Sequence, residues 1–189
     1  MEPVKVIAGG VSALLRDDVD TDQIIPKQFL KRVERTGFGA FLFYDWAKEP
    51  GWHLPSNPIL AAGRNFGSGS SREHAPWALE GAGYRAIVAA SFGDIFRTNC
   101  SKIGLLAVIL PEADVQELLD SAPAEATVDL ERLLVTLPSG REVAFPYDAD
   151  VRERLLHGWD DIALTLLREG EIVAYERDRE RSGPSTVAI

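Results

Sequence analysis

The stretch that decides the fold of this chain spans residues 58–111 and reads PILAAGRNFGSGSSREHAPWALEGAGYRAIVAASFGDIFRTNCSKIGLLAVILP. Three short apolar runs within it, at 58–63, 86–90 and 105–111, have the length and composition of buried strands. Segments of helical character separate these runs. Strand, helix, strand, helix and strand in this order predict right-handed crossovers and a parallel sheet segment.

The regions on either side of this centre predict antiparallel structure. VKVIAGG and VSALLR (4–16) are typical of two short strands joined in a hairpin at Gly9 and Gly10. RLLVTLPSGREVAFPY (132–147) predicts another hairpin, around Ser139 and Gly140. The chain therefore reads as a mixed α/β fold with a parallel centre and flanking hairpins and helices.

Helical patterns complete the second half of the chain. ADVQELLDSA (113–122) predicts a short helix, and residues 148–181 predict helices that break near Gly158 and Gly170. We expect one domain over residues 1–177 and a flexible tail over 178–189.

Composition limits the possible functions. The 189 residues carry a net charge of -9 and no cluster of Lys and Arg, which argues against nucleic-acid or membrane-surface binding. No apolar run reaches the length of a membrane span, and the first ten residues lack the pattern of a signal peptide. The one cysteine, Cys100, cannot form an internal disulfide, a thiolate zinc site or an iron–sulfur cluster. We expect a cytoplasmic protein that binds no metal.

The loop GRNFGSGSSREHAPWAL (63–79) is the strongest candidate for a functional site, although it fits none of three familiar motifs. It lacks the Gly-Lys-Ser/Thr of a phosphate-binding P-loop. Arg72 replaces the third glycine of a dinucleotide fingerprint, and Ser70 lacks the flanking glycines of a hydrolase elbow.

Physical chemistry suggests two compatible roles for this loop. Gly67 and Gly69 permit a close backbone approach, and Ser70 with Glu73 has the spacing of a helix-capping box. Arg72 is unexpected at a helix N-terminus, because its charge opposes the helix dipole unless an anion also binds there. Hydroxyls, backbone N–H groups and a guanidinium would together hold a carboxylate and stabilise a serine alkoxide.

Two details qualify the helix starts in this region. Pro76 removes a backbone hydrogen bond, so the residues before it are expected to form an irregular lead-in to the helix. Ser91, with Asp94 three residues later, predicts a capping box for the next helix.

The acidic segment DDVDTDQIIP (17–26) is the second candidate. It lacks the glycine and the closing glutamate of a calcium-binding EF-hand loop. Either it is a solvated loop with capping residues, or Asp20, Thr21 and Asp22 orient groups at a shared site. His74 is more typical of a structural hydrogen-bonding residue than of a ligand.

Together, GRNFGSGSSREHAPWALEGAGYRAIVAASFGDIFRTNCSKIGLLAVIL and DDVDTDQIIPKQFLKRVERTGFG resemble the small subunits of bacterial 3-isopropylmalate dehydratase, across roughly residues 1–175. The resemblance implies a swivelling β/β/α domain like the mobile domain of aconitase. It also implies a heterodimer in which a large subunit carries a [4Fe–4S] cluster. The implied reaction interconverts 2-isopropylmalate and 3-isopropylmalate by dehydration and rehydration, in leucine biosynthesis.

The same resemblance assigns roles to individual residues. Ser70 would be the catalytic base that removes a proton α to a carboxylate, while Ser71 and Arg72 would bind a substrate carboxylate. Leu30 and Val33 lie, by position, in the substrate-selecting loop, and we expect them to meet the isopropyl group; Arg32 and Arg35 are basic alternatives in the same loop. The expected supporting residues are Asp20, Thr21, Asp22, Gly67, Gly69 and His74.

Two alternatives stay open. The same scaffold serves related hydro-lyases, such as homoaconitase or enzymes of the methylmalate and citraconate type. A self-sufficient serine hydrolase, or a simple anion-binding module, would use the same loop in another way. A hydrolase needs a His–acid pair to activate Ser70, and His53, His74 and His157 lie in no recognisable setting for one.

Overall fold

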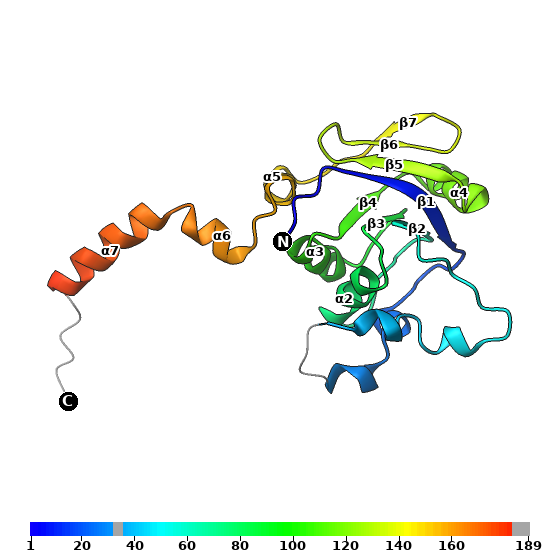
Figure 1. Cartoon of the computed structure of the whole chain (residues 1–189), viewed down its shortest axis with the longest axis horizontal. Coiled ribbons are helices and arrows are strands. Elements are labelled where there is room, and N and C mark those ends of the chain that lie inside the picture. Colours follow the sequence, from blue (N-terminus) through cyan, green and yellow to red (C-terminus); the bar gives the residue numbers. More distant parts are fainter. Residues whose placement is uncertain (32–35, 183–189) are drawn as a thin grey trace.

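A seven-stranded sheet organises the chain in a computed structural model that describes residues 1–31 and 36–182 (Figure 1). The strand order is β4-β3-β2-β1-β5-β6-β7. β1 to β4 run parallel to their neighbours, whereas the β1–β5, β5–β6 and β6–β7 pairs are antiparallel. The strands are β1 (Val6–Leu14), β2 (Ile59–Ala62), β3 (Ala86–Ala89), β4 (Leu106–Ile109), β5 (Glu125–Asp129), β6 (Leu134–Thr136) and β7 (Glu142–Ala144). The predicted parallel centre and the hairpin at residues 139–140 are confirmed, but the antiparallel strands all lie on one side.

β1 joins the two halves of the sheet. Its first half, residues 6–10, pairs with β5, and residues 11–14 pair with β2. The hairpin predicted at Gly9 and Gly10 is therefore wrong, because both glycines lie inside one continuous strand. The absence of a side chain on Gly9 lets Pro58 pack closely against β1 where the strand changes partner. A Cβ on Gly9 would lie 2.6 Å from Cγ of Pro58.

The parallel half is buried on both faces, as its apolar strands require. Leu60 and Ala62 belong to one core with α2 and α3, whereas Ile59 and Ala61 face a second core with α4 and α5. Side chains alternate along a strand, so a four-residue strand serves both cores. The helices are α2 (His74–Gly81), α3 (Asp94–Ile103), α4 (Glu112–Ser121) and α5 (Ala149–His157) (Figure 1).

The helix starts differ from those that serine spacing predicts. α2 begins at His74 after Glu73, without a side-chain cap, so the capping box predicted from Ser70 is wrong and the irregular lead-in is confirmed. The first turn accepts Pro76 because an N–H there has no partner within the helix. α3 follows Gly93, and Ser91 instead accepts a hydrogen bond from the Asn65 backbone N–H, at 2.8 Å.

A helical arm follows the body of the protein and extends away from it in Figure 1. It consists of α6 (Asp161–Leu166) and α7 (Glu169–Ser182). The break at Gly158 is confirmed, since this residue caps α5 in the left-handed conformation. The break predicted near Gly170 is confirmed, since the chain turns at residues 167–168 between α6 and α7; Gly170 itself lies in the first turn of α7. The domain boundary predicted after residue 177 falls within α7, and 183–189 lie outside the described residues.

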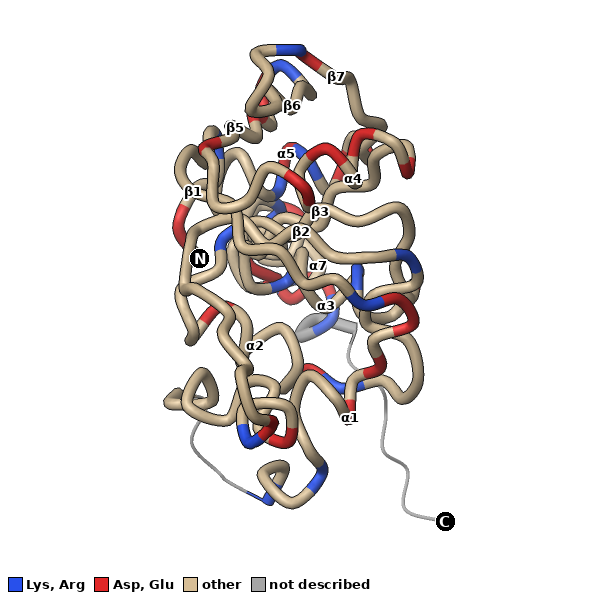
Figure 2. Tube along the Cα trace, turned by 90° about the vertical axis from the view of Figure 1, so that its right-hand side faces the viewer, with Lys and Arg blue, Asp and Glu red and all other residues tan. Residues whose placement is uncertain are grey.

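Charged residues are distributed over the whole fold. Figure 2 shows Asp and Glu along most of the described chain, with Lys and Arg interspersed among them. In the described part of the chain, no helix is both long and apolar enough to cross a membrane.

The connection between β1 and β2 contains short helices that pack against α2. They are α1 (Thr21–Ile24) and the 3₁₀ helices η1 (Lys27–Lys31), η2 (Phe38–Phe41) and η3 (Trp46–Lys48). Gly39 in η2 lies so close to α2 that an added Cβ would overlap the carbonyl group of Gly81. Backbone cannot yield as a flexible side chain does, so this contact requires glycine.

We therefore expect Gly39→Ala to lower the free energy of unfolding by about 1–3 kcal/mol, because the new methyl group overpacks the contact. Urea denaturation followed by circular dichroism measures the change. Gly170→Ala is the matched control, since a Cβ there meets nothing within 4 Å and helical Gly→Ala changes are neutral or slightly stabilising. Equal midpoints for Gly39→Ala and the wild type would contradict this account of the η2–α2 contact.

Candidate active site

The candidate site lies where the loops after three parallel strands meet. The carboxyl ends of parallel strands share one edge of a sheet, and ligands of α/β proteins bind there. Backbone hydrogen bonds join the loops in series: the Gly67 N–H donates to the Val19 carbonyl at 2.7 Å, and the Thr21 N–H donates to the Ser68 carbonyl at 3.0 Å. The Gly93 N–H donates to Phe66 at 2.9 Å. The two sequence motifs are therefore parts of one site.

The acidic segment caps a helix and also contacts the glycine loop. Asp20 caps α1, accepting from the Gln23 N–H at 2.8 Å, while the Gln23 side chain accepts from the Asp20 N–H at 2.9 Å. The capping box of this site thus lies in the acidic segment and not at Ser70. Asp17 accepts from the Arg64 N–H at 2.9 Å, and Asp18 accepts from the Asn65 side chain at 2.8 Å. These carboxylates hold the start of the glycine loop.

Thr21 fixes the serine turn directly. Its hydroxyl donates to the Ser70 carbonyl at 2.8 Å, and the residue is only 2% exposed. A buried hydroxyl with this partner orients the Ser70 backbone and leaves the serine side chain outside.

The glycine loop exposes the two serine hydroxyls. Gly67 and Gly69 have φ angles of 73° and 85°, in the left-handed region, and a Cβ on Gly67 would overlap the Phe96 ring. Ser70 and Ser71 follow as exposed residues in an irregular turn. Within residues 1–31 and 36–182, neither hydroxyl has a hydrogen-bond partner. Both are therefore available to an incoming ligand.

Arg72 already has a carboxylate partner. Its two terminal nitrogens bind the two carboxylate oxygens of Asp22, with Nη2 and Oδ2 at 2.8 Å. The Arg72 side chain is 14% exposed, whereas that of Asp22 is 51% exposed. The anion expected beside this arginine is thus present within the chain, supplied by the other motif, and it neutralises the cation at the start of α2.

A cavity of about 220 Å³ opens beside the turn. Ser70, Arg72 and Thr21 line it, together with Ile95 and Phe96 at the start of α3. The sequence prediction missed these α3 residues. They follow the third parallel strand at the same edge of the sheet, and that topology was the available signal.

Several predicted residues that the structure describes do not line this cavity: Ser71, Asp20, Asp22, His74 and Leu30. The His74 ring packs edge-on against Phe38, with centroids 5.1 Å apart, and lies 4.8 Å from the Trp77 ring. Leu30, in η1, is half-buried against the core that contains α2. Val33, like Arg32 and Arg35, lies outside the described residues. The proposed contact of Leu30 and Val33 with substrate stays a prediction.

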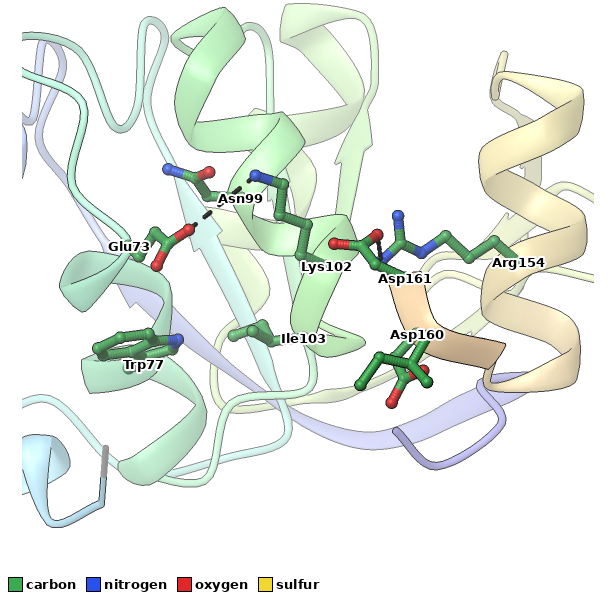
Figure 3. A pocket seen from close by; sticks show the side chains of 9 residues that line it. Glu73, Trp77, Asn99, Lys102, Ile103, Arg154, Asp160 and Asp161 are labelled. Atoms are coloured by element: carbon green, nitrogen blue, oxygen red, sulfur yellow. Dashed lines mark ion pairs between the residues drawn. The ribbon is translucent and has the colours of Figure 1, made fainter. Parts of the chain in front are cut away.

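Larger cavities lie away from the serines. One of about 360 Å³ lies between α2, α3 and the start of the arm, and Figure 3 shows two ion pairs among the side chains that line it. Lys102 faces Glu73 at 4.0 Å, and Arg154 binds Asp161 at 2.8 Å. Another, of about 830 Å³, lies between α6 and α7. Neither lies at the edge of the sheet where the two sequence motifs meet, so the smaller cavity there is the candidate site.

The described residues also define what the site does not hold. No group of three or more His, Cys, Asp and Glu side chains is placed to bind a metal within the ranges 1–31 and 36–182. Cys100 is buried in α3, and burial raises the pKa of its thiol, which therefore stays protonated and unreactive.

Comparison with known proteins gives this geometry a context. The aconitase C-terminal domain family matches residues 51–113, which include the glycine loop. The crystal structure of a 3-isopropylmalate dehydratase from Methanocaldococcus jannaschii superposes with a TM-score of 0.68 at 22% identity, covering 91% of this chain and 99% of that chain. The structural match shows the fold, and the family match shows an aconitase C-terminal domain over residues 51–113 of this chain.

Relatives of similar length narrow the class further. The 3-isopropylmalate dehydratase small subunit of Rhodopirellula baltica is 50% identical over 195 residues, covering 95% of this chain and all of that protein. The corresponding subunit of Anoxybacillus flavithermus is 51% identical over 193 residues, with the same coverage. The chain belongs to the family of 3-isopropylmalate dehydratase small subunits. The predicted fold and family are confirmed.

His74 provides a test of the packing beside the site. Burial lowers the pKa of its imidazole below the ordinary 6.5; Glu73 opposes this shift and Arg72 reinforces it. The unfolded chain consequently binds the proton more tightly, so folding stability from this group is present above pH 6.5 and is lost as pH falls below it. We expect the His74 ring to titrate below pH 6.5 in the folded protein, by NMR, and at a higher pH in urea. A folded-state midpoint at or above the urea value would show that the ring is not packed as described.

Proposed function

We propose that this chain supplies the acid–base and carboxylate-binding half of a two-subunit 3-isopropylmalate dehydratase. The complete enzyme interconverts 2-isopropylmalate and 3-isopropylmalate by removing and re-adding water, as a step of leucine biosynthesis. The observation that carries this proposal is the exposed Ser70–Ser71 pair beside Arg72, with both hydroxyls free, in a member of this family.

Arg72 has the donors to bind a substrate carboxylate without releasing Asp22. A guanidinium carries five N–H donors, and the bidentate pair with Asp22 uses one on each terminal nitrogen. The Nε–H and the outer hydrogens remain for a second carboxylate. Asp22 thus holds the guanidinium plane in one orientation, and Ser71 adds a hydroxyl donor to the same anion.

Ser70 is the proposed base. In dehydration its deprotonated Oγ takes the proton on the carbon α to a carboxylate, and the hydroxyl group leaves from the neighbouring carbon. In rehydration the same oxygen returns a proton to the substrate. The positive end of α2 favours the alkoxide, and the Thr21 hydrogen bond holds the turn in place.

The iron–sulfur cluster implied by the resemblance does not fit this chain. Its single cysteine is buried in α3, and the described residues offer no metal-binding group of side chains. We assign a [4Fe–4S] cluster to the large subunit, where it would polarise the leaving hydroxyl group as a Lewis acid. The two chains then form a heterodimer with the site between them, and we propose the cytoplasm as its location.

Reconstitution tests this proposal. Mixed anaerobically with the iron–sulfur large subunit, the chain is expected to support isopropylmalate turnover, and to have none alone. Ser70→Ala should lower kcat roughly 100- to 10,000-fold, the usual contribution of a positioned base, while the subunits still associate. Ser139→Ala, at the exposed tip of the β6–β7 hairpin, is the matched control. Turnover by the isolated chain would refute the two-subunit proposal, and full activity of Ser70→Ala would remove Ser70 as the base.

Arg72→Lys tests the carboxylate contact separately. Lysine keeps the charge but cannot bind Asp22 and a substrate carboxylate through planar pairs of donors. We expect KM for isopropylmalate to rise roughly 10- to 100-fold, as for loss of a charged hydrogen bond, with a smaller change in kcat. Arg85→Lys, in an exposed ion pair with Glu2, should leave both constants unchanged. An unchanged KM in Arg72→Lys would place the carboxylate elsewhere.

A further inference from the structure

Ile95 is an exposed apolar side chain at the candidate site. It is the second residue of α3 and is 53% exposed, and it lines the same cavity as Ser70 and Arg72. The other large apolar residues exposed in the described part of the chain do not line this cavity. They lie on β1 or just after it and on the arm: Val6, Leu15, Ile162, Leu166, Leu167, Val173 and Tyr175.

The first turn of α3 holds Ile95 in a fixed position relative to the serine turn. Phe96, the next residue, is 2% exposed, and its ring lies against Gly67, where a Cβ would overlap it. Successive helical residues point about 100° apart, so burying Phe96 turns Ile95 toward the surface beside the glycine loop. Gly93 is tied to the same loop by its hydrogen bond to Phe66 at 2.9 Å.

The other walls of the cavity are mostly polar. Hydroxyls and the guanidinium come from the serine turn and Thr21, and Asp94 contributes a carboxylate from α3. The cavity thus has an anion-binding side and an apolar side that faces solvent. A hydroxy acid with carboxylates and a branched alkyl group has the same two-sided chemistry. Part of the Leu30 side chain, by comparison, is already buried against the core.

We propose that Ile95 is a specificity-determining residue, whose side chain contacts the branched alkyl group of the substrate held by Ser71 and Arg72. This inference rests on the proposed function. The contact buries apolar surface of both partners, and its loss affects substrates with a large alkyl group more than those with a small one.

The test compares two substrates in the reconstituted holoenzyme: 3-isopropylmalate, and 3-methylmalate, which carries a methyl group in place of the isopropyl group. Ile95→Ala is expected to lower kcat/KM for isopropylmalate roughly tenfold or more, the usual effect of lost apolar contacts in a substrate pocket. For methylmalate, kcat/KM should stay nearly constant, so the ratio of the two constants falls. Ile95→Val should lie between Ile95→Ala and the wild type.

Matched variants separate this inference from its alternatives. Ile162→Ala makes the same change at an exposed isoleucine on the arm and should leave the ratio unchanged. Leu30→Ala measures the rival alkyl contact in the same assay. An unchanged ratio in Ile95→Ala, or weaker binding to the large subunit with equal losses for both substrates, would overturn the inference; the second result would make Ile95 an interface residue. An inactive wild-type holoenzyme would instead refute the proposed function.

Discussion

The short backbone ladder between residues 19–21 and 67–68 is the interaction on which the site depends. It joins two segments nearly fifty positions apart, through hydrogen bonds of 2.7 and 3.0 Å. With it in place, Asp22 reaches Arg72 and Thr21 reaches the Ser70 carbonyl. The two ladder bonds join backbone to backbone, and the Thr21 and Asp22 side chains then fix the position of the serine turn. Gly67 and Gly69, whose backbone is in the left-handed conformation, make these hydrogen bonds possible. A side chain on Gly67 would push the loop away from α3.

The site is also preorganised for the function proposed for it. Its charged groups are mostly satisfied internally, and the groups left free are the two hydroxyls that a substrate would need. Asp22 keeps Arg72 rigid and lowers the cost of a partly buried cation. A rigid guanidinium and a fixed turn lose little conformational entropy when a ligand binds. The preorganisation comes from α1 and the glycine loop together, and neither motif has it alone.

Much of the fold, and the position of the candidate site, could be predicted from the sequence where local pattern and topology agree. The parallel strands, their crossovers and the position of the serine turn follow from apolar runs and glycine spacing. The helix caps were predicted wrongly. Ser70 and Ser91 have the spacing of capping boxes, but their backbone belongs to loops that other contacts hold. Gly9 and Gly10 signalled a turn but serve the approach of Pro58 and Asn57 to a strand. The short, weakly apolar β5 gave no comparable signal, and its pairing with β1 and β6 defines it. Ile95 was missed because its importance depends on a neighbour distant in sequence.

β1 has a consequence beyond holding the sheet together. The first half of β1 pairs with β5, and its second half pairs with β2, so the strand has a separate register with each neighbour. A slip of a single residue between β1 and β5 would therefore shift the end of β1 along β2 by about 3.3 Å. That distance exceeds the length of the hydrogen bond between Arg72 and Asp22. The antiparallel half thus holds the first half of the strand whose other end leads into the acidic segment.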